Sequence, residues 1–101
     1  MSEVARQQHR RNVRVLSGLL PGNRRLARPL TVSIEYDDDE VVVSEPRFAI
    51  HASGPTEADA LAAFRRIFSG YLDVLSSQEE MLSIPLRHQL HYLRSYIRPA
   101  S

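Results

Sequence analysis

The segment from Gly54 to Leu75, GPTEADALAAFRRIFSGYLDVL, constrains the fold most, because it is long and periodic enough to anchor a core. Thr56 can cap the first turn, and Asp59 is spaced to reach back to it in a variant of the capping box, where Glu or Gln is usual. Apolar residues recur at helical spacing and share one broad face: Ala60, Leu61, Phe64, Ile67, Phe68, Tyr71, Leu72, Val74 and Leu75. The segment is predicted to be a long amphipathic helix.

Three segments before this helix have the pattern of β-strands. Leu30 to Tyr36 alternates apolar and polar residues, the period of a half-buried strand. Asp37 to Asp39 favours a turn, and Glu40 to Ser44 then returns as the second strand of a hairpin. Pro46 interrupts the ladder, and Arg47 to Ser53 alternates again as a third strand.

The two ends of the chain have weaker patterns. Residues 1–29 are basic and are interpreted as an arm or a helix with a thin apolar face. Ser83 followed by Pro85 favours a short C-terminal helix that begins near Ile84. The predicted fold is therefore α+β over residues 30–101: a three-stranded antiparallel sheet packed by one long helix, with a short C-terminal helix and an uncertain N-terminal helix or arm.

Composition narrows the setting in which the chain works. Its 101 residues suit one domain, and its lack of cysteine excludes a disulfide framework and thiolate chemistry. No apolar run approaches the roughly 20 residues of a membrane helix, and the N-terminus has no signal-peptide core. We therefore expect a cytoplasmic protein that makes no membrane contact.

All thirteen basic residues are arginine, and they are unevenly distributed. Residues 1–28 hold seven arginines against one acid, whereas the remainder holds six against eleven. The basic segment can contact a protein partner, can neutralise the phosphates of DNA or RNA, or can simply be solvated. Six candidates for contact with a partner or nucleic acid lie in it: Arg6, Arg10, Arg11, Arg14, Arg24 and Arg25.

No pattern in the chain predicts catalysis, a metal site or a cofactor. The run Asp37-Asp38-Asp39-Glu40 has the oxygen ligands that hard cations take, but consecutive acids point in different directions, so a solvated turn or a patch for an arginine-rich surface is favoured. His88 and His91 are two potential zinc ligands where a site needs three or four. The chain has no G-x-S-x-G motif and no glycine-rich phosphate loop. We predict that it is not an enzyme.

Three stretches of the chain carry a family resemblance: LTVSIEYDDDEVVV, the Glu45-Pro46 pair before the third strand, and GPTEADALAAF at the strand-to-helix junction. Residues 30–75 resemble the HicB-like antitoxins of bacterial and archaeal toxin–antitoxin systems. The last stretch is similar to the family's G-D-T-x-E-E-A-L pattern. Gly54, Thr56, Ala60 and Leu61 match it, and Asp59 stands where Glu is usual.

The chain departs from the family in three places. Pro55 replaces the usual Asp, and Arg47-Phe48-Ala49 stands in place of a Pro-Gly-Cys-like element. The C-terminal piece LSIPLRHQLHYLRSYI does not resemble the helix-turn-helix or ribbon-helix-helix domains that bind operator DNA. It is similar to the closing helix of stand-alone HicB-like proteins.

The resemblance implies a truncated ribonuclease-H-like fold without nuclease activity, often dimeric, that binds and neutralises a cognate RNA-cleaving toxin. Two alternatives remain: a nucleic-acid-binding regulator that uses the basic N-terminal arm, and a structural dimerisation domain. The apolar surface of the last helix is large for so small a domain, and such a surface is covered by another chain or by the same one. The expected homodimer contacts are Leu90, Tyr92, Leu93, Tyr96 and Ile97.

Overall fold

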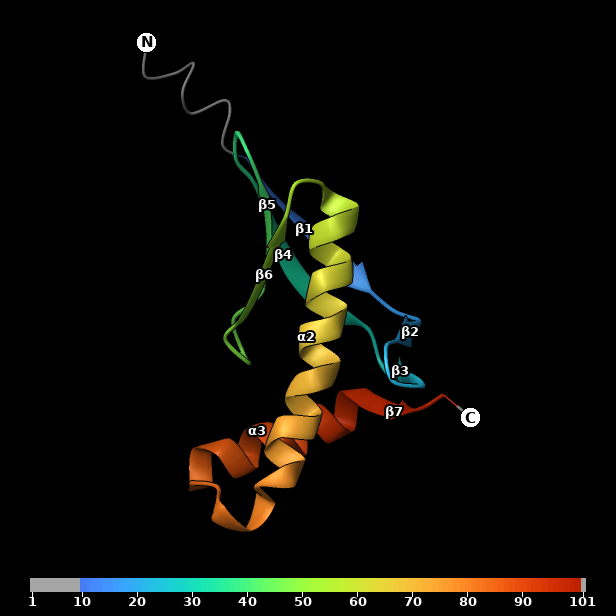
Figure 1. The fold of residues 1–101 in the computed structure, drawn as a ribbon, viewed down its shortest axis with the longest axis vertical. Helices are drawn as coiled ribbons and strands as arrows, with labels where there is room; N and C mark the ends of the chain where they lie inside the picture. The colour runs from blue at the N-terminus through green and yellow to red at the C-terminus, as the bar shows by residue number, and fades with distance from the viewer. Residues whose placement is uncertain (1–9, 101) are drawn as a thin grey trace. The chain divides into compact units, whose positions relative to one another are not determined.

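The computed structural model describes residues 10–100 as an α+β protein (Figure 1). Its elements in chain order are β1 (Arg10–Leu16), β2 (Leu19–Leu20), β3 (Arg24–Leu26), β4 (Leu30–Tyr36), β5 (Val41–Glu45), β6 (Ile50–Gly54), α2 (Glu57–Ser77), the 3-10 helix η1 (Glu79–Met81), α3 (Ile84–Tyr96) and β7 (Ile97–Pro99). Contacts divide them into two compact units. Of the described residues, the first unit holds 10–15 and 31–64, and the second holds 16–30 and 65–100.

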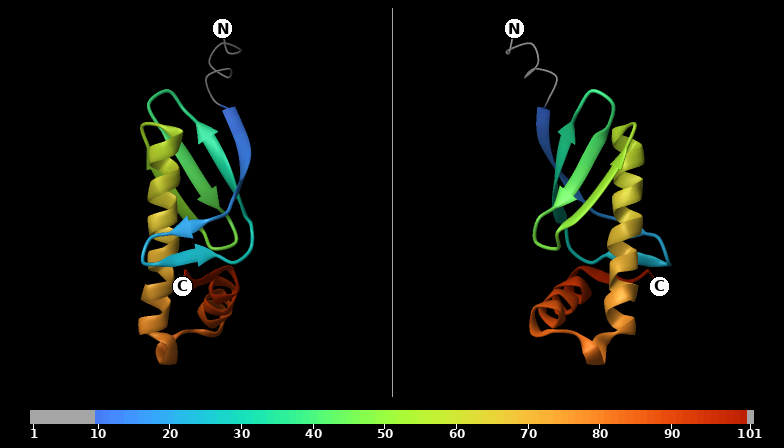
Figure 2. Two further views of the ribbon diagram at one scale, coloured as in Figure 1. Left: turned by 90° about the vertical axis from the view of Figure 1, so that its right-hand side faces the viewer. Right: turned by 60° about the vertical axis from the view of Figure 1, so that its left-hand side comes forward.

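The first unit is built on a four-stranded sheet in the order β1-β4-β5-β6. The register pairs Ile34 of β4 with Val43 of β5, and Val43 with Ala52 of β6, in antiparallel fashion. These three side chains are buried, as are Ala60 and Phe64 in the N-terminal turns of α2. Figure 2 shows these turns running alongside the sheet. The predicted hairpin and long helix are confirmed.

The predicted three-stranded sheet lacks one strand, because residues 10–16 form β1 beside β4. The expected N-terminal helix or arm is therefore wrong for this stretch. Val13 and Val15 alternate with Asn12 and Arg14, which is the period of a strand, and β-branched valine favours an extended backbone. Residues 1–9 lie outside the described residues.

The third predicted strand begins three residues later than expected, at Ile50. Residues 46–49 form a turn in which Ala49 has a positive φ of 55°. The carboxylate of Glu45 is buried, and its Oε1 accepts a 2.8 Å hydrogen bond from the Phe48 N–H. The Phe48 amide is therefore satisfied within the turn and not by a neighbouring strand, and the strand pairing resumes at Ile50.

The second unit combines helices with a small antiparallel sheet in the order β2-β3-β7. Leu20, Leu26 and Ile97 of this sheet are buried, as are apolar residues of the helices: Phe68, Leu75, Leu90, Leu93 and Tyr96. Ser83 caps α3 by accepting a hydrogen bond from the Leu86 N–H, and proline occupies its first turn, as predicted. None of the described helices is long and apolar enough to span a membrane.

Candidate functional site

Three of the candidate arginines donate to partners within their own unit. Arg11 pairs with Glu35 at 3.1 Å, and the Nε of Arg14 donates to Glu57 Oε2 at 3.1 Å. In the second unit, Arg24 donates to the Ser69 carbonyl at 2.8 Å and pairs with Asp73. These guanidinium groups are therefore partly occupied by the fold itself. Arg6 and the Arg10 side chain lie outside the described part of the chain.

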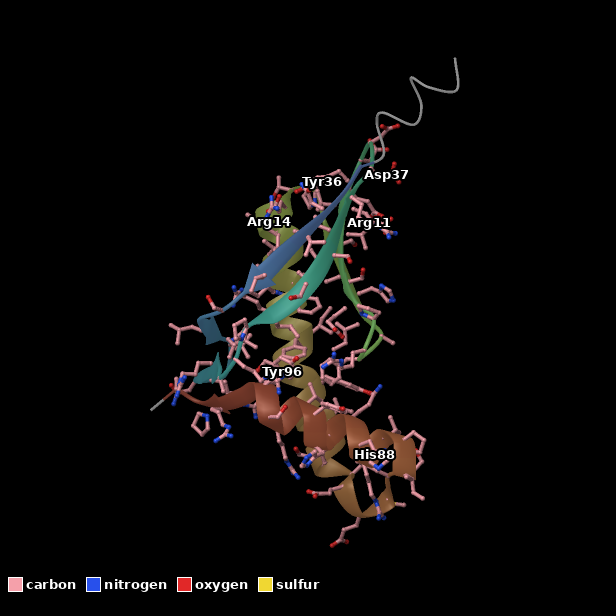
Figure 3. All side chains as sticks on the ribbon, turned by 180° about the vertical axis from the view of Figure 1, so that it is seen from behind. Arg11, Arg14, Tyr36, Asp37, His88 and Tyr96 are labelled. Carbon is pink, nitrogen blue, oxygen red and sulfur yellow. The ribbon has the colours of Figure 1, made fainter. Side chains whose placement is uncertain are left out.

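Glu57, in the first turn of α2, joins two strands of the first unit to the helix. Tyr36 of β4 donates its hydroxyl to Glu57 Oε1, and Arg14 of β1 donates to both carboxylate oxygens. The hydrogen bond from Tyr36, assisted by the charge of Arg14, lowers the pKa of Glu57 below its ordinary value of 4.5. A carboxylate with a lowered pKa stays ionised near neutral pH, so it serves as a charge partner and not as a proton donor. Sequence reasoning missed this cluster, of which Tyr36 and Arg14 are labelled in Figure 3.

The acidic run Asp37–Glu40 forms the turn of the β4–β5 hairpin. The Asp37 N–H donates to the Glu40 carbonyl at 2.9 Å, and the Asp38 N–H donates to Asp37 Oδ1 at 2.9 Å. All four side chains are exposed, and none of the ion pairs formed within residues 10–100 includes them. Across the same residues, no group of three or more His, Asp or Glu is placed to hold a metal ion. The run is an exposed acidic turn.

The outer face of the β2-β3-β7 sheet carries an unusual row of side chains. Arg25 pairs in register with Leu19 on one side and with Arg98 on the other. All three are exposed, and Leu19 is 72% exposed. Like charges directly opposite each other destabilise a sheet, and β2, β3 and β7 contain no acid. The row therefore concentrates positive charge beside an apolar side chain.

This row was only partly predictable. Arg25 was selected from the charge of the N-terminal segment, whereas Arg98 was not. The two arginines are neighbours because β3 pairs with β7 at the other end of the chain. No short-range sequence pattern indicates such a pairing.

The last helix presents a mixed surface to solvent. A pocket of about 450 Å³ is lined by two acids of η1, three bases of α3 and one leucine: Glu79, Glu80, Arg87, His91, Arg94 and Leu90. Arg94 donates two hydrogen bonds to Glu79, at 3.0 and 2.9 Å, and this contact lowers the pKa of that carboxyl group. His88 is exposed on α3 (Figure 3).

The predicted dimer surface is mostly folded into the chain. Leu90, Leu93, Tyr96 and Ile97 are all at most 6% exposed, and the Arg28 guanidinium lies 4.2 Å from the centre of the Tyr96 ring. Tyr92 is 47% exposed. The first four pack within the monomer, which is one of the two ways such an apolar surface is covered. Tyr92 remains the accessible member of the set.

Charge divides between the two units. The described residues of the first unit carry four arginines against eight acids, a balance of −4, and those of the second unit carry eight arginines against three acids, a balance of +5. Each unit therefore suits a partner of opposite charge.

Comparison of the chain with protein-family models, with curated proteins and with solved structures gave no match.

Proposed function

We propose that this protein is a non-catalytic, antitoxin-like protein that binds and neutralises a cognate RNA-cleaving toxin in the cytoplasm. The exposed acidic turn Asp37–Glu40 is the observation that carries the proposal. A toxin that cleaves RNA must hold phosphate groups, so we expect its working surface to be positively charged. An acidic turn complements such a surface and can occupy it in place of RNA.

The resemblance to HicB-like antitoxins supports the same function. Residues 30–75 carry the resemblance, and in the structure they form β4, β5, β6 and most of α2. Thr56 and Asp59, at the matching junction, form the expected cap: the Asp59 N–H donates to Thr56 Oγ1 at 3.1 Å, and Thr56 Oγ1 donates to Asp59 Oδ2 at 3.0 Å. The cap fixes where α2 begins relative to β6.

Neutralisation in this scheme is electrostatic and steric. Complementary charge accelerates encounter with the toxin, and the hairpin tip then covers the surface on which the toxin holds RNA. The electrostatic attraction weakens as salt screens the carboxylates. The protein transforms nothing itself, and its role is to keep RNA away from the toxin.

The product of the adjacent reading frame is the partner to test. It is expected to co-purify with this protein and to lose RNA-cleaving activity on its addition. The double variant Asp38→Asn with Asp39→Asn should weaken binding most at low salt, where the charges are least screened. It should leave the fold intact, because neither side chain makes a hydrogen bond or ion pair with another described residue. The control is Glu80→Gln, which removes an exposed carboxylate from the second unit. Absence of binding would refute the proposal, and equal binding by both variants would refute the role of the turn.

The Arg25–Arg98 row favours a second function, the binding of nucleic acid. Arginines bind phosphates through charge-assisted hydrogen bonds, and such binding weakens steeply with salt. Deleting residues 1–28 would remove β1, β2 and β3, so a point variant is the better test. Arg25→Ala should reduce salt-dependent binding of a short RNA or DNA duplex, whereas Arg66→Ala, an exposed position on α2, should not. Equal effects would show that only total charge matters.

A further inference from the structure

The strand β1 has an edge open to another strand. It lies at one end of the order β1-β4-β5-β6, and among the described residues only β4 pairs with it. The N–H and C=O groups on such an edge form a template for a further strand. Val13 and Val15, which point to the same face, are 59% and 63% exposed. An open edge beside exposed valines is a surface for association.

The arginines of β1 protect this edge less than their number suggests. Charged side chains on an edge strand normally oppose pairing with another chain. Arg11, however, is paired with Glu35, and Arg14 is paired with Glu57, each at 3.1 Å. Because the charges of Arg11 and Arg14 are offset within their own chain, a second β1 meets less repulsion.

We propose that β1 pairs with β1 of a second copy of this chain, antiparallel and centred on Val13. A two-fold axis that relates two antiparallel strands is perpendicular to the sheet, so the outer faces of both sheets lie on the same side. Residues directly opposite each other must then point to the same face, so in every allowed register one residue lies opposite its own copy at the axis. Centring on Val13 pairs all seven residues of β1 and sets no arginine opposite another. Centring on Asn12 sets Arg10 opposite Arg14, and centring on Arg11 or Arg14 sets that arginine opposite its own copy. The number of paired residues and the absence of arginine–arginine pairs therefore select the same register.

This register makes specific neighbours across the two-fold axis. Val13 lies opposite its own copy, Val15 opposite Arg11, and Arg14 opposite Asn12. The aliphatic stem of arginine can cover a valine, and the Asn12 amide oxygen can accept from a guanidinium. The two four-stranded sheets become one continuous eight-stranded sheet. The inference holds whether or not the protein neutralises a toxin.

Single cysteines test the register directly, because the chain has none of its own. Val13→Cys in the full chain should give a covalent dimer on mild oxidation, since the two sulfurs meet at the axis. Val15→Cys is the matched control, equally exposed on the same strand. Its copy lies four residues along the ladder, about 14 Å away at roughly 3.4 Å per residue, so Val15→Cys should form no disulfide-linked dimer. No dimer from Val13→Cys, or equal dimer from both variants, would overturn the proposal.

The mass of the unmodified chain in solution provides a second test. Sedimentation over a concentration series should show a monomer–dimer equilibrium. Val13→Arg sets two arginines opposite each other and should give a folded monomer, whereas Val13→Thr should keep the dimer. A chain that is monomeric throughout would overturn the proposal. A dimer lost with Tyr92→Arg but kept with Val13→Arg would overturn it too, and would place the interface on α3.

Discussion

The Arg14 guanidinium and the Glu57 carboxylate are 43 residues apart in sequence, yet the Nε of Arg14 lies 3.1 Å from Oε2 of Glu57. This pair ties the edge strand β1 to the first turn of α2. Tyr36 adds β4 to the same carboxylate through its hydroxyl. One acid therefore connects three elements of the first unit.

We expect this carboxylate to make stability depend on pH in the acid range. The Tyr36 hydrogen bond, aided by Arg14, lowers the pKa of Glu57 in the folded state below its ordinary value of 4.5. The unfolded chain then binds the proton more readily, so the stabilisation is complete above the unfolded pKa and is lost as pH falls through the folded pKa.

Thermal unfolding midpoints measured across this pH range provide the test. The unmodified protein should lose stability more steeply on acidification than Glu57→Gln, which cannot titrate. Tyr36→Phe should fall between them, because it removes the main cause of the lowered pKa. Identical pH profiles for all three proteins would contradict the linkage.

Two Gly→Ala substitutions should have opposite effects on stability. A Cβ at Gly54 would lie 2.8 Å from the Asp59 Cβ and 2.9 Å from the Ala60 nitrogen, so the strand and the helix start would have to separate. Gly54→Ala should therefore lower the free energy of unfolding by about 1–3 kcal/mol. A Cβ at Gly70 would meet nothing within 4 Å. Because alanine is favoured over glycine inside a helix, Gly70→Ala in α2 should raise the free energy of unfolding by about 0.5–1 kcal/mol. Urea unfolding of both variants measures the difference, and a shared sign would be inconsistent with this packing.

The neighbours Val42 and Val43 test the two faces of the sheet with one residue type. Val43 is fully buried, whereas Val42 is half-buried on the other face. Val43→Ala should lower the free energy of unfolding by about 1.5–3 kcal/mol, and Val42→Ala by roughly half as much. Chemical denaturation of the pair checks both values. A larger loss from Val42→Ala would mean that the register places the wrong face in the core.

Sequence reasoning succeeded where one short segment carries the whole signal. The alternation in Leu30–Tyr36, the acidic turn and the cap formed by Thr56 and Asp59 are all local patterns, and the structure contains each of them. It failed for β1, because the alternation of Val13 and Val15 is short and lies within a run of arginines. The small sheet was missed because β3 finds its partner β7 only through the fold, with Leu26 opposite Ile97.

The candidate site divides in the same way. Charge alone selected the N-terminal arginines, but it cannot assign a partner to each one. Glu35, Glu57 and Asp73 lie 24, 43 and 49 residues from the arginines that they contact. Contacts at such separations depend on the tertiary fold. The sequence therefore predicts the sign of a surface's net charge, but it does not predict which of those charges the fold itself neutralises.

The facing pair Arg25 and Arg98 predicts a charge-reversal cycle. Arg25→Glu alone should create an opposite-charge pair across β3 and β7 and raise stability by about 0.2–1 kcal/mol, and Arg98→Glu alone should do the same. The double variant restores a like-charge pair, so the two gains should not add. Thermal midpoints at low and high salt measure the coupling, which screening should reduce. Additive gains would show that the two arginines do not interact. If Arg25→Glu is more stable but no longer binds the duplex, the arginine pair is retained at a cost in stability because it binds an anionic partner.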